Sequence, residues 1–399
     1  MIENVIKNEL CLGCGICESS FGADKIKVTF NEEGYLRPQQ YQPLSKKENA
    51  RFKQICPGIN VKHESTSSHH PLWGPLLSIR SGFSTNNDIR NSGSSGGVLT
   101  SIASYLIENN KVECIVHIGP SSEQPYKNEV KVSYTSNEIT SNAGSRYAPS
   151  ATLINIIQIL EKHDSLAIIG KPCDIVGVRN LMKTNQEAKV KIKFLLSFMC
   201  AGIPSQNATT DIMNEFNVSP ENVSSLKYRG DGWPGYFKIE EKSGETHKMS
   251  YNESWGTILN KKLQFRCKIC ADGTGEFADI TCADAWVTTK KGYPSFQERN
   301  GQSLIITRNN DGENLLNEAT KAGYLKISRK NITEKEVGKM QPYQKARKQN
   351  LLPRLAALKF LGRTVPKFNY NRLFIATARE NPFRLLKNFL GMLRRAWKS

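Results

Sequence analysis

Three cysteines near the start of the chain have the spacing of iron–sulfur ligands. The stretch CLGCGIC places two residues between Cys11 and Cys14, and two more between Cys14 and Cys17. Thiolates at this spacing can surround one face of a four-iron cube. Gly13 and Gly15 lie between them and let the backbone curl around such a cube.

A fourth ligand is expected farther along the chain. In ferredoxins with two clusters a fourth cysteine follows after three residues, but Phe21 occupies that position here. Cys56 is followed by Pro57, as a remote fourth ligand should be. We therefore predict one [4Fe–4S] cluster on these four cysteines. The alternative is a zinc site, although four-cysteine zinc sites more often pair two separate C-x2-C units.

A second group of four cysteines is predicted to meet at one edge of a sheet. Two of them share the tight loop CKIC, and two others follow directly after buried strands. Strand ends at one edge of a sheet lie close in space, so these sulfurs could hold a second cluster, with zinc as the alternative. The four residues are Cys173, Cys200, Cys267 and Cys270. Cys114 and Cys282 lie inside predicted strands and are expected to pack in the core.

Two stretches rich in small residues precede predicted helices. NSGSSGGVLTSIASYL, residues 91–106, could present backbone N–H groups and serine hydroxyls to a phosphate at a helix N-terminus. It matches neither a Walker motif nor a G-x-G-x-x-G fingerprint, and a flexible turn that caps the helix is the alternative. AGSRYAPS repeats the pattern, with a surface capping loop as its alternative. The candidate ligand-binding residues are Ser92, Gly93, Ser94, Ser95, Gly96, Gly97, Ser145, Arg146 and Tyr147.

The elements that must position these residues alternate between strands and helices. From residue 76 to about 308, β-rich runs such as VECIVHIG and KIKFLLSF follow segments that are apolar at helical spacing. This order predicts a largely parallel or mixed sheet covered by helices, of the α/β or α+β class. We expect a small ferredoxin-like domain over 1–62, a polar linker over 63–75 in which the pair His69 and His70 is solvated, a larger catalytic domain over 76–330, and a basic helical tail over 331–399.

The charge of the chain is concentrated in that tail. The net charge is +18, but residues 341–399 carry 14 lysines and arginines against one acid, Glu380, which is +13 of that total and leaves +5 for the other 340 residues. A nearly neutral body argues against a nucleic-acid binder. The last segment, NPFRLLKNFLGMLRRAWKS, predicts a basic amphipathic helix that could lie on an anionic membrane, on a partner, or on the body of the protein.

The length of 399 residues allows two or three domains, and no apolar run approaches the length of a membrane span. The N-terminus lacks the pattern of a secretory signal. We therefore expect a cytoplasmic protein, in contact at most with the inner membrane surface.

Seven motifs occur along the chain in the order CLGCGIC, RNSGSSGGVLTSIASYLIE, AGSRYAPS, GKPCDIVGVR, YRGDGWPG, CKIC and ADITCADAW. With these motifs the chain resembles the coenzyme F420 hydrogenase/dehydrogenase beta-subunit family. The resemblance covers roughly residues 5–325. It implies FAD, one or two [4Fe–4S] clusters, and the exchange of electron pairs with one-electron carriers. It also implies that residues 92–97 and 145–147 contact the FAD diphosphate or ring.

The resemblance assigns catalytic candidates as well. Lys171 stands where the family usually has threonine before Pro-Cys, and it could lie near the isoalloxazine or be solvated. Asp284 follows Ala283, where the family usually has glycine, and could contact a ligand or stabilise a turn. The resulting hypothesis is an FAD- and iron–sulfur-dependent oxidoreductase that uses ferredoxin, a deazaflavin coenzyme or a polysaccharide or lipid-linked precursor. The alternatives are an electron-transfer subunit of a larger redox complex and a zinc-bearing nucleic-acid binder.

Overall fold

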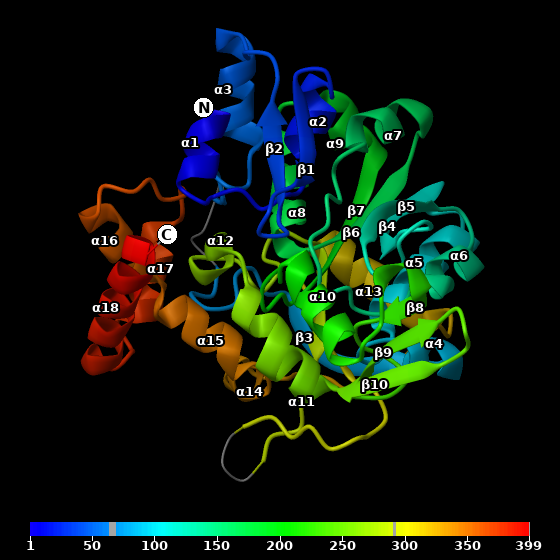
Figure 1. The fold of residues 1–399 in the computed structure, drawn as a ribbon. Coiled ribbons are helices and arrows are strands. Elements are labelled where there is room, and N and C mark those ends of the chain that lie inside the picture. Colours follow the sequence, from blue (N-terminus) through cyan, green and yellow to red (C-terminus); the bar gives the residue numbers. More distant parts are fainter. Residues whose placement is uncertain (64–68, 290–292, 399) are drawn as a thin grey trace.

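An eight-stranded mixed sheet forms the centre of the molecule (Figure 1). In this computed structural model, which describes residues 1–63, 69–289 and 293–398, the strand order is β13-β3-β12-β11-β7-β6-β4-β5. Strands β11, β7, β6 and β4 run parallel, and the remaining pairs are antiparallel. The strands are β3 (Ser78–Ser84), β4 (Cys114–Pro120), β5 (Asn128–Ser133), β6 (Leu166–Gly170), β7 (Ile192–Phe198), β11 (Ile280–Asp284), β12 (Ser303–Thr307) and β13 (Leu325–Arg329). The predicted mixed sheet is confirmed.

The parallel strands set the position of the candidate site. Their carboxyl ends lie at one edge of the sheet, where β4 ends at Pro120, β6 at Gly170, β7 at Phe198 and β11 at Asp284. Ligands of open α/β sheets bind outside this edge. The fold therefore brings the segments that follow β6 and β7, each of which carries a cysteine, to the same side of the molecule.

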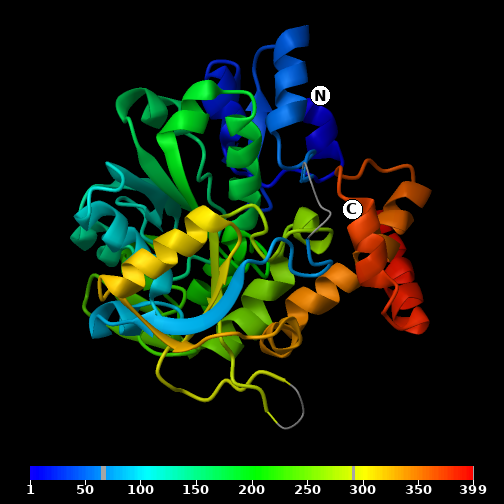
Figure 2. The same cartoon turned by 180° about the vertical axis from the view of Figure 1, so that it is seen from behind.

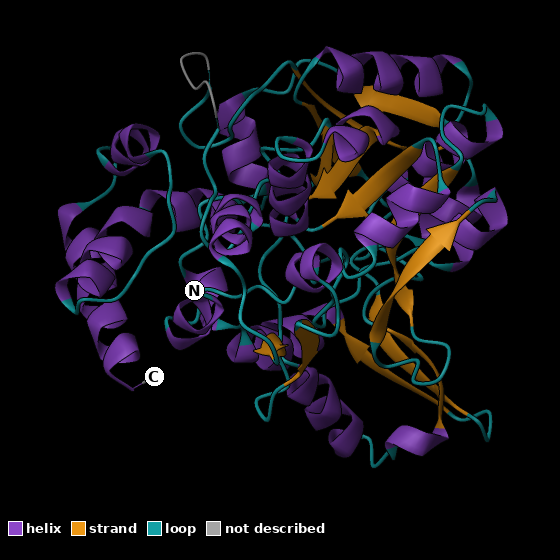
Figure 3. Cartoon of the chain, turned by 90° about the horizontal axis from the view of Figure 1, so that it is seen from above, coloured by secondary structure: helices purple, strands orange, loops and turns teal. Residues whose placement is uncertain are grey.

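Helices cover both faces of the sheet. Successive side chains of a strand point to opposite faces, and because apolar residues occupy both kinds of position, both faces must be shielded from water. On one face Ala167 and Leu196 pack against α5 and α13, and on the other Leu166 and Ile168 pack against α7, α8 and α9. Figure 3 shows these helices on both sides of the strands. The helices of this region are α4 (Asn87–Ser92), α5 (Val98–Glu108), α6 (Ser136–Ser141), α7 (Ile156–Lys162), α8 (Pro172–Met182), α9 (Gln186–Lys191), α10 (Gln206–Glu215) and α13 (Asn310–Lys321).

The N-terminal unit contains the predicted hairpin, β1 (Ile26–Phe30) and β2 (Leu36–Gln40), with α1 (Ile2–Lys7), α2 (Ile16–Phe21) and α3 (Lys46–Ile55). It shares a core with the body: Ile16 and Phe52 belong to the same apolar cluster as Ile175 of α8 and Leu355. The first 62 residues are therefore packed onto the central sheet and not separated from it by an independent core.

The segment expected as a polar linker packs against the body where the structure describes it. Residues 64–68 lie outside the described residues. Trp73 is almost fully buried, and its indole N–H donates to the carbonyl of Glu334 at 3.2 Å. His70 accepts from the backbone of Leu72 at 3.1 Å, so it is part of a turn and not a freely solvated side chain.

The C-terminal region is helical, as predicted, and lies along one side of the body (Figure 2). Its helices are α14 (Glu334–Met340), α15 (Pro342–Gln349), α16 (Leu351–Phe360), α17 (Tyr370–Thr377) and α18 (Pro382–Lys398). A third, smaller sheet of β8 (Val223–Lys227), β9 (Tyr236–Glu241) and β10 (Thr246–Ser250) precedes α11 (Tyr251–Glu253) and α12 (Phe265–Lys268). In the described residues, no helix has both the length and the hydropathy needed to cross a bilayer.

Candidate functional site

The first cysteine set lies around one small cavity in the N-terminal unit. Cys11, Cys14, Cys17 and Cys56 all line it, as the sequence predicts. The backbone between the first three cysteines turns through left-handed conformations at Gly13 (φ 69°) and Gly15 (φ 86°). This conformation favours glycine, and at Gly15 a Cβ would also lie 2.7 Å from the backbone of Ile154. The two glycines therefore allow the loop to pack against the segment before α7.

The sulfurs of this set influence one another. Burial raises the pKa of Cys17 well above its usual value, and the nearby Cys11, Cys14 and Cys56 raise it further. Burial and then Cys11 raise the pKa of Cys56 to about 12. Without a bound cation all four would be neutral thiols, because burial removes the water that stabilises a thiolate and because four buried negative charges would repel one another. A cationic centre is what would hold them as thiolates.

The second set is also brought together. Burial raises the pKa of Cys173 well above its usual value, and Cys200 and Cys267 contribute to the shift. Burial raises the pKa of Cys200 to about 12, with contributions from Cys267 and Cys270. Cys173 lies in the first turn of α8 after β6, and Cys200 follows β7, so both stand at the strand ends where the sequence predicts them.

The spacing of the sulfurs bears on the choice of metal. Tetrahedral Zn–S bonds of about 2.3 Å place the four thiolates about 3.8 Å apart. Within the described ranges, no three of these cysteine sulfurs lie within 4.8 Å of one another. As the side chains are placed here, no three of these sulfurs have the spacing of ligands to one zinc ion.

One side chain links the two sets. Leu12, in the loop between Cys11 and Cys14, is buried in a small apolar cluster with Ile203, Cys267 and Cys173. A residue of the first cysteine loop therefore packs against two cysteines of the second set.

Lys171 is buried and bonded, so the alternative of a solvated lysine is wrong. Its ammonium group donates to the hydroxyl of Ser150 at 2.6 Å and lies 2.8 Å from the carboxylate of Asp174. Asp174 also accepts from the hydroxyl of Thr152 at 2.7 Å and is fully buried, with its second oxygen unpartnered. Burial opposes the charge of Lys171, but Asp174 and then Cys173 hold its pKa above the usual value. The ion pair is close enough to Cys173 and to Cys14 to influence the pKa of both thiols.

Asp284 has a structural set of partners. Arg229 donates to both carboxylate oxygens, at 2.8 and 2.9 Å, and the indole of Trp233 donates at 2.6 Å. The guanidinium of Arg229 is buried over the ring of Trp286, 5.1 Å from its centre, and Trp286 stacks on Trp233 at 4.9 Å. The carboxylate thus fixes the arginine and the aromatic rings at the end of β11.

In the serine- and glycine-rich loop, most of the small residues contact other segments of the protein and are not free to contact a ligand. Gly97 has φ 72°, and a Cβ there would lie 2.8 Å from the carbonyl of Ile89. A Cβ at Gly96 would lie 2.7 Å from the carbonyl of Gly82, so these glycines allow the chain to pack against itself. Ser94 and Ser95 bond to neighbouring segments, Ser94 accepting from Ser145 N–H at 2.6 Å. Only the buried hydroxyl of Ser92, among the three serines, lacks a partner.

A cavity of about 600 Å³ lies beside this loop, within the size range of cofactor pockets. Ser145 and Arg146 line it, together with Arg229, Lys131 and several serines. The guanidinium of Arg146 donates to the side chain of Asn128 and to the carbonyls of three other residues, so it braces the cavity wall. Residues 92–97, Tyr147, Lys171 and Asp284 do not line this cavity. Tyr147 packs against the rings of Trp255 and Tyr228 instead.

Comparisons with known proteins identify the family of the chain. Two family models match the chain: the N-terminal part of the coenzyme F420 hydrogenase/dehydrogenase beta subunit over residues 79–158, and its C-terminal part over residues 163–333. The chain belongs to this family.

Individual relatives are distant but cover much of the chain. The coenzyme F420 hydrogenase beta subunit of Methanothermobacter thermautotrophicus is 25% identical over 301 residues, 74% of this chain and 99% of that protein. The F420-dependent formate dehydrogenase beta subunit of Methanocaldococcus jannaschii is 27% identical over 61% of this chain and 59% of its own length. A chain of the F420-reducing [NiFe] hydrogenase complex of Methanosarcina barkeri has the same fold, with a TM-score of 0.59 and 18% identity over 76% of this chain and 99% of that chain. The relatives are therefore named as parts of redox enzymes.

The region beyond the family models contributes to the site. Arg347 and Gln344 of α15 both donate to the carbonyl of Cys200 at 3.0 Å, and Arg354 of α16 donates to the carbonyl of Lys268 at 3.0 Å. These contacts hold the loops that carry three of the second-set cysteines. Sequence reasoning missed them, because basic residues in a strongly basic tail look solvated.

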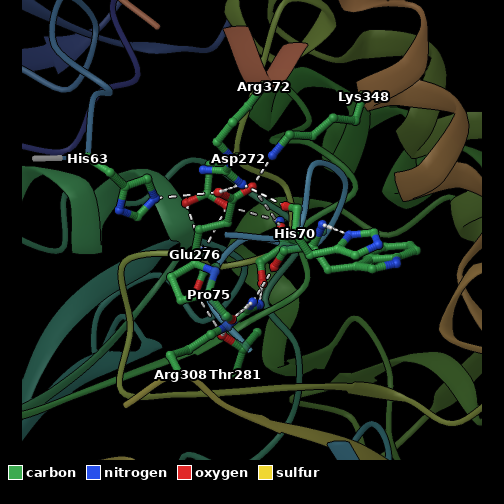
Figure 4. A network of polar contacts seen from close by, with 12 residues as sticks. His63, His70, Pro75, Asp272, Glu276, Thr281, Arg308, Lys348 and Arg372 are labelled. Atoms are coloured by element: carbon green, nitrogen blue, oxygen red, sulfur yellow. Dashed lines mark hydrogen bonds and ion pairs between the residues drawn. The ribbon is translucent and has the colours of Figure 1, made fainter. Parts of the chain in front are cut away.

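A buried charged network joins the same region to the body (Figure 4). Glu276, in the loop between Cys270 and β11, is paired with Lys348 of α15 and with Arg372 of α17, the latter at 2.8 Å. His63 lies 3.4 Å from the same carboxylate. Burial acts to raise the pKa of Glu276, but Lys348 and Arg372 together hold it well below its usual range. The network therefore fixes the helices of the C-terminal region beside the second cysteine set.

Proposed function

We propose that the chain is an iron–sulfur flavoprotein oxidoreductase that exchanges electrons between a two-electron carrier and one-electron carriers. The observation that carries this proposal is the cavity lined by Cys11, Cys14, Cys17 and Cys56, beside which Leu12 packs against Cys173 and Cys267 of the second set. Sets of four cysteines are the usual ligands of [4Fe–4S] clusters.

The cluster ligands would be the eight cysteines predicted from the sequence. Cys11, Cys14, Cys17 and Cys56 would hold one [4Fe–4S] cluster, and Cys173, Cys200, Cys267 and Cys270 a second. Lys171 and Asp174 add a buried ion pair beside Cys173, where a fixed positive charge favours the reduced state of a nearby cluster. Lys171 would thus raise the reduction potential of the second-set cluster without itself binding the cluster.

The flavin would lie at the carboxyl edge of the parallel strands. The cavity of about 600 Å³ has a polar lining that suits a nucleotide, and the unpartnered hydroxyl of Ser92 lies in the loop beside it. Bound FAD would supply the ability to take up an electron pair and release single electrons. In this assignment Ser145 and Arg229 bind and orient, while Arg146 and Asp284 hold the walls of the site in place.

The test is the cofactor content of three variants purified without oxygen. We expect about eight irons and one flavin per chain in the parent protein, about four irons in each of Cys56→Ala and Cys173→Ala, and the parent value in Cys114→Ala, a buried cysteine outside both sets. Iron-free protein that carries zinc in both sets would overturn the proposal.

A second candidate is an electron-transfer subunit without a substrate of its own, favoured by the naming of the relatives as subunits. Coenzyme F420, which those names contain, and ferredoxin are the carriers to assay. Turnover of an organic substrate by the isolated protein with reduced ferredoxin supports the enzyme. Flavin and clusters that exchange electrons only when a partner subunit is added support the second candidate.

A further inference from the structure

The last helix, α18, has one buried side and one exposed side. On its buried side Met392 is fully buried, and Asn388 bonds to Arg354 of α16 at 2.7 Å and to Asn350 at 2.9 Å. These contacts fix the rotation of the helix about its own axis. The side chains that face outward are therefore a defined surface of the folded protein.

An apolar strip runs along the exposed side. Its members follow one another at intervals of three, four and seven residues, which places them on one face of a helix. Their exposed fractions range from 54% to 83%, although single exposed apolar residues are normally scattered. The apolar strip consists of Phe383, Leu386, Leu390 and Trp397.

A basic strip lies directly beside the apolar strip. Lys387 and Arg394 are seven residues apart and adjoin the leucines around the helix, and Arg384 and Arg395 lie farther round the same side; all four are exposed. Glu380, the single acid of residues 341–399, is largely buried and accepts from Arg384 and Asn350 at 3.3–3.4 Å. Glu380 thus partly neutralises Arg384, while in the described residues Lys387, Arg394 and Arg395 make no ion pair, so the exposed side of α18 carries net positive charge next to apolar surface.

We propose that the exposed side of α18 binds to an anionic phospholipid surface. The apolar strip would enter the boundary between headgroups and acyl chains, and the basic strip would contact the phosphates, which is how basic amphipathic helices bind membranes. A second copy of the chain is a poor occupant, because it would bring the same cations against each other. Figures 1 and 2, seen from opposite sides, both place α18 at the outer edge of the molecule, where a flat surface can reach it.

The proposal is independent of the redox function, because it concerns residues outside the matched family region. Its consequence is peripheral attachment: an enzyme so placed would meet substrates or redox partners that are themselves held at the membrane. The contribution of the basic residues to attachment should weaken as the salt concentration rises, because salt screens the charge of the anionic lipids.

The experiment is co-sedimentation of the full chain with vesicles. Vesicles of phosphatidylcholine with about a third phosphatidylglycerol are compared with pure phosphatidylcholine, at low and high salt. We expect binding to the anionic vesicles, a loss of about tenfold or more in Lys387→Glu/Arg394→Glu, and a similar loss in Leu386→Ser/Leu390→Ser. The control Lys47→Glu/Lys189→Glu makes the same change of charge at exposed positions on other helices and should bind as the parent does.

Three results would overturn the proposal. These are the absence of binding at low salt, equal binding to both kinds of vesicle, and equal loss in the control. Dimers of the parent that the α18 variants abolish, without any vesicle binding, would assign the strip to a second copy. Circular dichroism and iron content of each variant separate a lost surface from a lost fold.

Discussion

Replacing Glu276 by glutamine should destabilise the protein strongly. The substitution keeps the size of the side chain but removes the charge that faces Lys348 and Arg372, both about 94% buried. At 2.8 Å and an effective dielectric constant of about 20, Coulomb's law gives roughly 6 kcal/mol for the contact with Arg372 alone. Desolvation of the three groups offsets part of this. Because two buried cations would remain unpaired, we expect a loss of about 3–5 kcal/mol in the free energy of unfolding.

The assay is denaturant-induced unfolding of the anaerobically purified protein, followed by circular dichroism and tryptophan fluorescence. Glu187→Gln is the matched control: it removes a carboxylate that pairs with Lys191 at the surface, and should cost less than about 1 kcal/mol. Adding Lys348→Met to Glu276→Gln removes one of the two unpaired buried cations, and should restore part of the free energy of unfolding that Glu276→Gln loses.

The effect of pH has a definite sign. The pKa of Glu276 is lower in the folded protein than its usual value of 4.5, so its stabilisation is present above that value and lost as pH falls below it. The difference between parent and Glu276→Gln should stay constant from pH 8 to about 5 and shrink in stronger acid. A difference below about 1 kcal/mol at neutral pH, equal to that of Glu187→Gln, would refute the reasoning.

Three further predictions concern buried groups at the candidate site and in the sheet. Lys171→Met removes the positive charge beside Cys173 and leaves Asp174 unpaired; the reduction potential of the second-set cluster should fall in a redox titration, and an unchanged potential would contradict this role. Asp284→Asn weakens the bidentate contact with Arg229 beside the stacked indoles, so unfolding should occur at lower denaturant and the tryptophan emission should change; emission identical to the parent's would argue against the contact. Burial raises the pKa of Cys114 to about 12 from 9.0, so the folded protein should lose stability between pH 9 and 12, and Cys114→Ala should lose less over that range.

The positions of the cysteines were predictable because two rules apply to them. Ligand spacing is local, so Cys11, Cys14 and Cys17 predict a cluster without knowledge of the fold. Cys173 and Cys200 follow buried strands, and parallel strands end at one edge. The contact of Leu12 with Cys173 and Cys267 was not predictable, because the sequence does not show which faces of two distant segments will meet.

Charged residues were harder to place. Lys171 precedes Asp174 by three residues at the start of a helix, a spacing that could have indicated an ion pair, but its burial depends on Ser150 from a distant segment. In the composition of the chain Arg347 and Lys348 appear only as two positive charges. Both are nevertheless buried, because Arg347 donates to the carbonyl of Cys200 and Lys348 pairs with the carboxylate of Glu276. The packing of the N-terminal unit against the body was not predictable for a similar reason: apolar patterning shows which side chains are buried, but not which other side chains cover them.

The central claim is that two iron–sulfur clusters lie close together in this chain, and electron paramagnetic resonance of the reduced protein tests it most directly. Two reduced [4Fe–4S] clusters held by these two sets, which Leu12 links by contact, should interact magnetically and give a broadened signal of about two spins per chain. Cys173→Ala should convert it to the sharper signal of a single cluster. A parent protein that shows one isolated cluster, or none after reconstitution with iron and sulfide, would contradict the account.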